Sequence, residues 1–97
     1  MPLTATQKRH LRQLAHALKP VVIIGHAGLS PALLAELDSS LERHELLKVR
    51  VNAEDREARR ALTQALCEQT RSERVQSIGH IAVIYRRAEK PRLSLPA

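Results

Sequence analysis

The spacing of apolar residues changes several times along this chain, and each change marks an expected secondary-structure element. The first apolar stripe has the spacing of one helix face: Leu11, Leu14 and Leu18. It predicts a helix over residues 5–18, opened by a capping box between Thr4 and Gln7. Residues 21–24 are apolar at every position, which is typical of a strand that is buried on both faces and central in its sheet.

Two more helices, with a strand between them, are expected in the middle of the chain. Apolar residues at helical spacing predict a helix over residues 31–44. Residues 46–51 alternate, so we expect one strand face in the core and the other, with Lys48 and Arg50, in water. A third helix is predicted over residues 55–70. Its inward side chains are expected to be small or apolar: Ala58, Ala61, Leu62, Ala65 and Leu66.

The last part of the chain predicts a hairpin followed by an extended tail. Strands 74–78 and 81–86 flank Gly79 and His80, a pair suited to a two-residue turn because glycine readily adopts a positive φ. Residues from about 88–97 are expected to run over the surface. The order α-β-α-β-α-β-β predicts an α/β (α+β) fold with a single mixed four-stranded sheet packed with three helices. The two helical crossovers imply parallel neighbouring strands.

The composition fits one domain over residues 1–97 and disfavours several classes of protein. The single cysteine, Cys67, excludes an internal disulfide framework and is expected to be a half-buried structural thiol. No signal-peptide core or membrane-spanning run is present, so a soluble cytoplasmic protein is expected. The five histidines lack metal-ligand spacing, and no catalytic constellation emerges. We therefore expect no metal, no cofactor, no small-molecule substrate and no enzymatic activity.

Positive charge is concentrated at the two ends of the chain. Sixteen Lys and Arg residues against ten Asp and Glu residues give a net charge of +6. The first 35 residues contain cations and no acids: Lys8, Arg9, Arg12 and Lys19. A second basic cluster, with Glu89 as its only acid, begins at the end of the last predicted strand: Arg86, Arg87, Lys90 and Arg92. This clustering favours a polyanionic partner such as a nucleic acid.

The tetrad Gly25-His26-Ala27-Gly28 carries the most specific functional signal. It joins the apolar run 21–24 to Ser30 and Pro31, which are typical of a helix start. Glycines before a helix N-terminus suit phosphate binding, because the backbone can approach closely and the helix end is partly positive. For the glycines alone, a tight strand-to-helix turn without a ligand is the alternative. A dinucleotide site is disfavoured because the G-x-G-x-x-G spacing is missing.

Four stretches of the sequence, in order and with matching gaps, carry a family resemblance: LTATQKRHLRQLAHALKPVVIIGHAGLS, ELLKVRVNAEDRE, VQSIGHIAVIYRR and LSLP. In these the chain resembles the stand-alone bacterial CRM-domain proteins of the YhbY type. The resemblance implies a fold similar to the C-terminal domain of bacterial initiation factor three. It also implies RNA binding in ribosome assembly, chiefly of the large subunit. The family's GxxG loop, here Gly25 to Gly28, is compared with the KH-domain loop that clamps an RNA backbone. Its middle positions often include Lys or Arg, whereas this chain has His26 and Ala27.

Further candidate RNA contacts come from charge and spacing. One track comprises Lys8, Arg9, Arg12 and Lys19; a second patch comprises Lys48, Arg50, Arg86 and Arg87. Tyr85 is the only aromatic residue apart from histidine, and its register with Ile81 and Val83 places it in the core. Binding through backbone charge and shape, rather than base stacking, is therefore expected.

These observations lead to one hypothesis with two alternatives. We expect a monomeric RNA-binding protein that contacts structured ribosomal RNA or pre-ribosomal particles, without a membrane. The main alternative is a protein-binding adaptor that docks on an acidic ribosome-assembly partner. A DNA-binding domain is disfavoured because no helix-turn-helix pair is evident.

Overall fold

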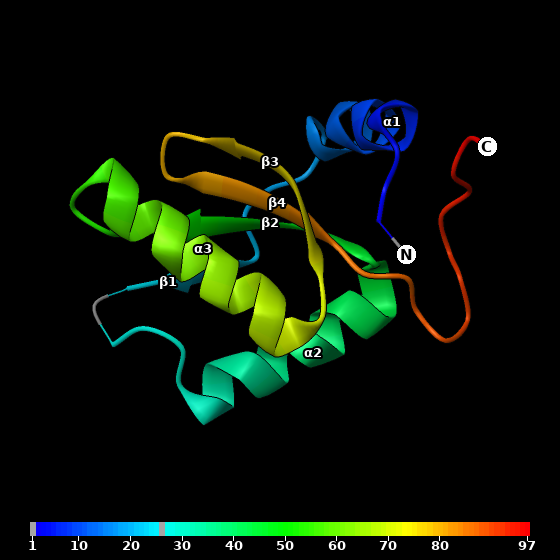
Figure 1. Cartoon of the computed structure of the whole chain (residues 1–97). Coiled ribbons are helices and arrows are strands. Elements are labelled where there is room, and N and C mark those ends of the chain that lie inside the picture. Colours follow the sequence, from blue (N-terminus) through cyan, green and yellow to red (C-terminus); the bar gives the residue numbers. More distant parts are fainter. Residues whose placement is uncertain (1, 26) are drawn as a thin grey trace.

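Four strands form one mixed sheet in the computed structural model, which describes residues 2–25 and 27–97 (Figure 1). The elements are α1 (Ala5–Ala15), β1 (Val22–Ile24), α2 (Pro31–His44), β2 (Leu46–Val51), α3 (Arg56–Thr70), β3 (Glu73–Ile78) and β4 (Ile81–Tyr85). The strand order across the sheet is β1-β2-β4-β3, with β1 parallel to β2 and the other pairs antiparallel. The predicted element order and the α+β class with a mixed sheet are confirmed.

Helices lie on both faces of the sheet (Figure 1), and each face has its own apolar core. α2 and α3 cover one face over the larger core, which consists of Val22, Ile24, Leu37, Leu41, Leu47, Val49, Val51, Leu66, Ala82 and Ile84. α1 covers part of the other face over a smaller core of Leu11, Ala15, Leu46, Val75, Val83 and Tyr85. Each fully buried Leu or Ile contributes about 1.5–3 kcal/mol through apolar burial, so the larger core dominates the hydrophobic stabilisation.

β1 is an outer strand, and the prediction of a central strand buried on both faces is wrong. Val22 and Ile24 face the larger core, but Val21 is 50% exposed and Ile23 is 61% exposed. Only β2 pairs with β1 within the described residues. An all-apolar run indicates burial on both faces only when both faces are covered. Here α1 lies over other strands and leaves this side of β1 in water.

The second helical crossover does not produce parallel neighbours. β4 lies between β2 and β3 and is antiparallel to both. The hairpin over Gly79 and His80 is confirmed, with Ile78 paired to Ile81 and a φ of +56° at Gly79. A register shift between Arg74 and Gln76 gives β3 a bulge. Because β4 lies between β2 and β3, it is an inner strand, which explains its nearly continuous apolar sequence.

α1 begins as predicted and ends earlier. The capping box is present: Thr4 Oγ1 accepts from the Gln7 N–H at 3.1 Å, and Gln7 Oε1 accepts from the Thr4 N–H at 3.0 Å. The helix closes at Ala15 with tightened turns between residues three apart. Leu14 and Leu18 are 38% and 37% exposed, so the inward stripe continues through Ala15 instead.

The predicted inward face of α3 is confirmed in part: Leu66 is buried, and Leu62 packs against the larger core. Ala58 and Ala61 are exposed, whereas Thr63, Leu66 and Thr70 are buried. The two buried threonine hydroxyls donate to backbone carbonyls one turn earlier, each at 2.8 Å. Small apolar side chains are also tolerated in water, which is why the predictions for Ala58 and Ala61 were wrong.

The segment after β4 is docked onto the body of the protein by Glu45, whose residue surface is 0% exposed. Its carboxylate accepts backbone N–H bonds from Ala88 at 2.8 Å, Arg92 at 2.5 Å and Leu93 at 2.8 Å. Burial alone would raise the pKa of Glu45, but these three donors and the charge of Arg87 hold that pKa below its usual value. The tail therefore does not simply run over the surface: Ala88 is buried, and Leu93 packs on the smaller core.

In the part of the chain that the structure describes, every helix is too short or too polar to cross a bilayer.

Candidate nucleic-acid interface

The GxxG loop joins the end of β1 to the start of α2, and its two glycines have different roles. Gly28 has a φ of +69° and donates its N–H to the Gly25 carbonyl at 3.0 Å, which closes a tight turn. A Cβ at either glycine would have no atom within 4 Å. Gly28 is therefore needed for its backbone conformation, while Gly25 leaves open space beside the chain. Ala27 is exposed; His26, the fourth predicted loop position, lies outside the described residues.

The start of α2 offers fewer free donors than its sequence suggests. The Ser30 hydroxyl caps the helix by accepting from the Leu33 N–H at 3.1 Å, and Pro31 has no N–H. In the first three helical residues, only the Ala32 N–H has no acceptor within the described part of the chain. Phosphate binding at this end of α2 consequently depends on the loop itself and on nearby cations.

Backbone hydrogen bonds hold three loops side by side at one end of the sheet. The Asn52 N–H donates to the Ile24 carbonyl at 2.8 Å, directly before the GxxG loop. The Val51 N–H donates to the His80 carbonyl at 2.6 Å in the β3–β4 turn. Figure 1 shows the same gathering of the β1–α2 loop, the β2–α3 loop and the hairpin turn. We call this the open end of the sheet.

The two predicted cations of β2 lie on the sheet face opposite α2 and α3, as the alternation indicated. Lys48 is half-buried, and Arg50 is exposed with its Nε bonded to Asn52 Oδ1 at 3.0 Å. Arg50 belongs to a cross-strand row that spans all four strands: Ile23, Arg50, Ile81 and Ile78. This row presents one cation among apolar side chains near the open end.

A groove of about 400 Å³ runs between the first turns of α3 and the β3–β4 hairpin. Its lining contains basic side chains from both elements: Arg56, Arg59, Arg60, Arg74 and His80. No Asp or Glu lines it among the described residues. We call this set the arginine groove; Lys8 of α1 lies at its margin.

The sequence interpretation missed this groove for two reasons. Acids interleave the arginines along the chain, as Glu57 does, and Arg74 and His80 come from a different element. One signal was available: Arg56 and Arg60 are four residues apart, a spacing that places both on the same side of a helix.

The cations of the first predicted track do not surround the GxxG loop. Lys8 lies 3.7 Å from Glu73 and contributes to the arginine groove. Arg9 is exposed and Arg12 is half-buried on α1, across the sheet from α2. Lys19 is exposed before β1, whereas the loop follows β1. The three strand residues between them span about 10 Å.

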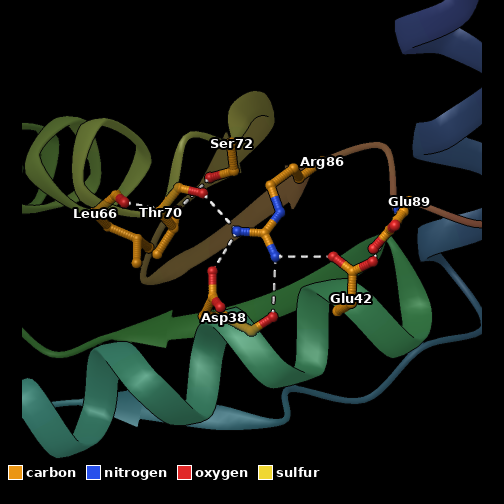
Figure 2. A network of polar contacts seen from close by, with 7 residues as sticks. All are labelled: Asp38, Glu42, Leu66, Thr70, Ser72, Arg86 and Glu89. Carbon is orange, nitrogen blue, oxygen red and sulfur yellow. Dashed lines mark hydrogen bonds and ion pairs between the residues drawn. The ribbon is translucent and has the colours of Figure 1, made fainter.

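The second predicted patch is divided between the two faces of the sheet. The Arg86 guanidinium donates to Asp38 Oδ1 at 2.5 Å and to the Thr70 carbonyl at 2.9 Å (Figure 2). It also donates to the Asp38 carbonyl at 3.0 Å and to Glu42 Oε2 at 3.5 Å. Arg86 thus joins α2 to the end of α3 on the face away from Lys48, and its charge is compensated. Its neighbour Arg87 is exposed.

Histidine, cysteine and tyrosine are the other side-chain types that could take part in a site. No group of three or more His, Cys, Asp and Glu residues there could hold a metal ion. Cys67 is half-buried, and burial raises the pKa of its thiol, which disfavours the nucleophilic thiolate. Tyr85 is 7% exposed and part of the smaller core, as predicted.

Comparison with known proteins gives consistent relationships over almost the whole chain. The family model for the CRS1 / YhbY (CRM) domain matches residues 3–86. A probable RNA-binding protein of Pseudomonas aeruginosa is 46% identical, covering 98% of this chain and 91% of the relative. An RNA-binding protein of Haemophilus influenzae is 44% identical, with 97% and 95% covered. The solution structure of a hypothetical protein from Staphylococcus aureus matches with a TM-score of 0.85 and 41% identity, covering 98% of this chain and 100% of that one. This chain therefore belongs to the CRS1/YhbY (CRM) domain family.

Proposed function

We propose that this protein is a non-catalytic RNA-binding protein and that the open end of its sheet is the contact surface. The observation that carries the proposal is the gathering of the GxxG loop, Arg50 and the arginine groove around one sheet end. The names of the Pseudomonas and Haemophilus relatives describe RNA-binding proteins, which supports the same class of ligand.

The proposed ligand is folded RNA, chiefly ribosomal RNA in precursors of the large subunit. Single-stranded RNA is commonly held by stacking bases on aromatic side chains, which contributes about 1–3 kcal/mol per base. The single Tyr, Tyr85, is buried, and the chain has no Phe or Trp. Without base stacking, the means of recognition are contacts to phosphates and to the shape of a folded RNA. We propose that the protein acts in this way as a monomer in the cytoplasm.

The predicted site residues contribute unequally to this proposal. The loop Gly25 to Gly28, with Lys48 and Arg50, forms its centre. Exposed or half-exposed cations farther away add long-range attraction to the polyanion: Lys8, Arg9, Arg12, Lys19 and Arg87. Arg86 is left out because acids within the protein already compensate it.

Titration of the protein against ribosomal RNA fragments at several salt concentrations tests the proposal. If five phosphates are neutralised, log K should fall against log salt with a slope of roughly −3.5 to −4.5. A flat response to salt would exclude the electrostatic mechanism. Crosslinking followed by sequencing of the attached RNA would then identify the target.

A matched pair of loop variants tests the position of the site. Gly25→Asp and Gly25→Asn add side chains of nearly equal size into open space. Only Asp adds a negative charge beside the proposed phosphate. We expect Gly25→Asp to bind RNA about tenfold more weakly than Gly25→Asn; equal affinities would move the site away from the loop.

The adaptor hypothesis has one observation in its favour. Ile23 and Ile78 are 61% and 64% exposed on the same sheet face, at the two ends of the Arg50 row. Copurification of an acidic protein that survives nuclease treatment, and that an Ile23→Ser/Ile78→Ser variant loses, would support this second function. Retained RNA affinity in the same variant would show that the two functions are separate.

A further inference from the structure

The arginines of the groove carry charge that the protein itself does not compensate. Within the described residues, ion pairs involve only Lys8 and Arg86 among the cations. Arg56, Arg60 and Arg74 are exposed and make no such pair. The guanidinium of Arg59 bonds to the Ala53 carbonyl at 3.2 Å. It also lies 3.5 Å from His80 Nε2, which brings two basic groups together.

This arrangement opposes folding electrostatically, because like charges four residues apart on a helix repel one another. Arg56 and Arg60 have this spacing, and Arg74 lines the same groove from β3. A bound polyanion would attract each arginine and compensate the repulsion between them. The groove geometry therefore suits a ligand with more than one negative charge.

Arg74 of the groove and the GxxG loop lie at opposite edges of the sheet. The loop follows β1 and the groove borders β3, and these are the two outer strands in the order β1-β2-β4-β3. Three strand spacings of about 4.8 Å place the two edges roughly 14 Å apart. Between them, the hydrogen-bonded β1–α2, β2–α3 and β3–β4 loops lie side by side at the open end.

We propose that the arginine groove binds the backbone of a second RNA strand, so that loop and groove together select double-stranded over single-stranded RNA. This inference rests on the proposed RNA-binding function and specifies the form of RNA that the open end accepts. Each site contacts phosphates of one strand, so a ligand with two backbones can occupy both sites at once. Base stacking has no part in the recognition. A flexible single strand therefore engages one site at a time, and its binding is weakened by the conformational entropy lost when it becomes ordered.

The test compares two RNA probes on charge-matched variants of the full chain. The probes are an RNA hairpin with a stem of about 16 base pairs, the length that a double-strand-binding domain spans, and an unstructured oligouridine of about 16 nucleotides. Arg60→Gln/Arg74→Gln removes two groove charges. The control Arg43→Gln/Arg92→Gln removes two exposed charges from the end of α2 and from the tail.

We expect the groove variant to bind the hairpin about tenfold more weakly than the control and to bind oligouridine within about twofold of it. The salt slope for the hairpin should fall by roughly 1.4–1.8, which corresponds to two lost phosphate contacts. Neither variant should unfold at a lower denaturant concentration than the unchanged protein, because these side chains are exposed.

Two results would overturn the inference and leave RNA binding intact. One is hairpin affinity equal in the groove and control variants; the other is an equal loss for both RNA probes. Absence of salt-dependent binding of either probe to the unchanged protein would instead overturn the proposed function, and this inference with it.

Discussion

Charged side chains are compensated within the protein at one end of the sheet and uncompensated at the other. At the end where β4 finishes, Arg86 pairs with Asp38 and Glu42 (Figure 2), and the buried Glu45 accepts three backbone N–H bonds. We call this the closed end. In the groove, which begins at the open end, the arginines have no acid within ion-pair distance among the described residues. Arginine guanidinium groups therefore stabilise the fold at the closed end, whereas those of the groove are available to a ligand.

Burial explains this difference. The Arg86 side chain is 17% exposed, so an uncompensated charge there would carry a large desolvation cost. Arg56, Arg60 and Arg74 are exposed and remain hydrated without a partner. Positive charge in the sequence therefore indicates an interface only where the fold leaves it accessible and uncompensated. Stability measurements should separate the two ends, and the following variants are ordered from the largest expected effect to the smallest.

Glu45→Gln should cause the largest loss, about 3 kcal/mol of unfolding free energy, because an amide cannot satisfy all the backbone N–H groups that the carboxylate accepts. Glu45 also adopts a φ of +63°, a conformation that non-glycine residues rarely keep without compensation. Urea denaturation measures the loss. A change below about 0.5 kcal/mol would show that the closed end does not depend on this carboxylate.

The pH dependence of stability should contain a component that Glu45→Gln removes. The folded-state pKa of Glu45 is lowered, so its ionised form stabilises the fold above the unfolded-state pKa of about 4.3. That contribution is lost as pH falls through the lower, folded-state pKa. The difference in unfolding free energy between the two proteins should narrow progressively below about pH 4. A constant difference in acid would contradict the lowered pKa.

Arg86→Gln should cost about 2 kcal/mol, because the contacts that join α2 to the end of α3 are broken and the Thr70 carbonyl loses its donor. Its affinity for RNA should fall no more than that of Arg43→Gln, which also removes one charge. Thermal unfolding and titration measured on the same samples check both statements. A selective loss of RNA affinity would place Arg86 in the interface after all.

Gly28→Ala should cost about 1 kcal/mol, since a Cβ at φ +69° is strained. Gly25→Ala should be close to neutral or slightly stabilising, because it restricts the unfolded chain without creating a clash. Comparing the two by denaturation isolates the conformational role of Gly28. Equal effects would indicate that the loop relaxes around either substitution.

Arg60→Gln/Arg74→Gln should have the smallest effect on stability, within about 0.5 kcal/mol of the unchanged protein. Removing like charges relieves repulsion, so any change should be stabilising at low salt and vanish at high salt. A clear destabilisation would mean that these arginines serve the fold, and the contrast between the two ends would disappear.

Local signals predicted much of the fold. The Thr4 and Ser30 caps, the hairpin turn at Gly79 and the alternation of β2 depend on neighbouring residues, and the structure confirms them. The GxxG loop was predicted for the same reason, because a strand, two glycines and a helix start are contiguous in the chain. The sequence by itself determined the types of element, their order and the position of this loop.

Tertiary structure alone decided which charges are compensated and which faces are covered. The outer position of β1, the insertion of β4 between β2 and β3, and the docking of the tail on Glu45 depend on contacts between distant residues. The arginine groove arises in the same way, since α3 and β3 bring together cations that acids separate along the chain. Spacing along a chain encodes periodicity, whereas burial and charge compensation depend on which segments pack together. That physical difference is why the loop was visible in the sequence and the groove was not.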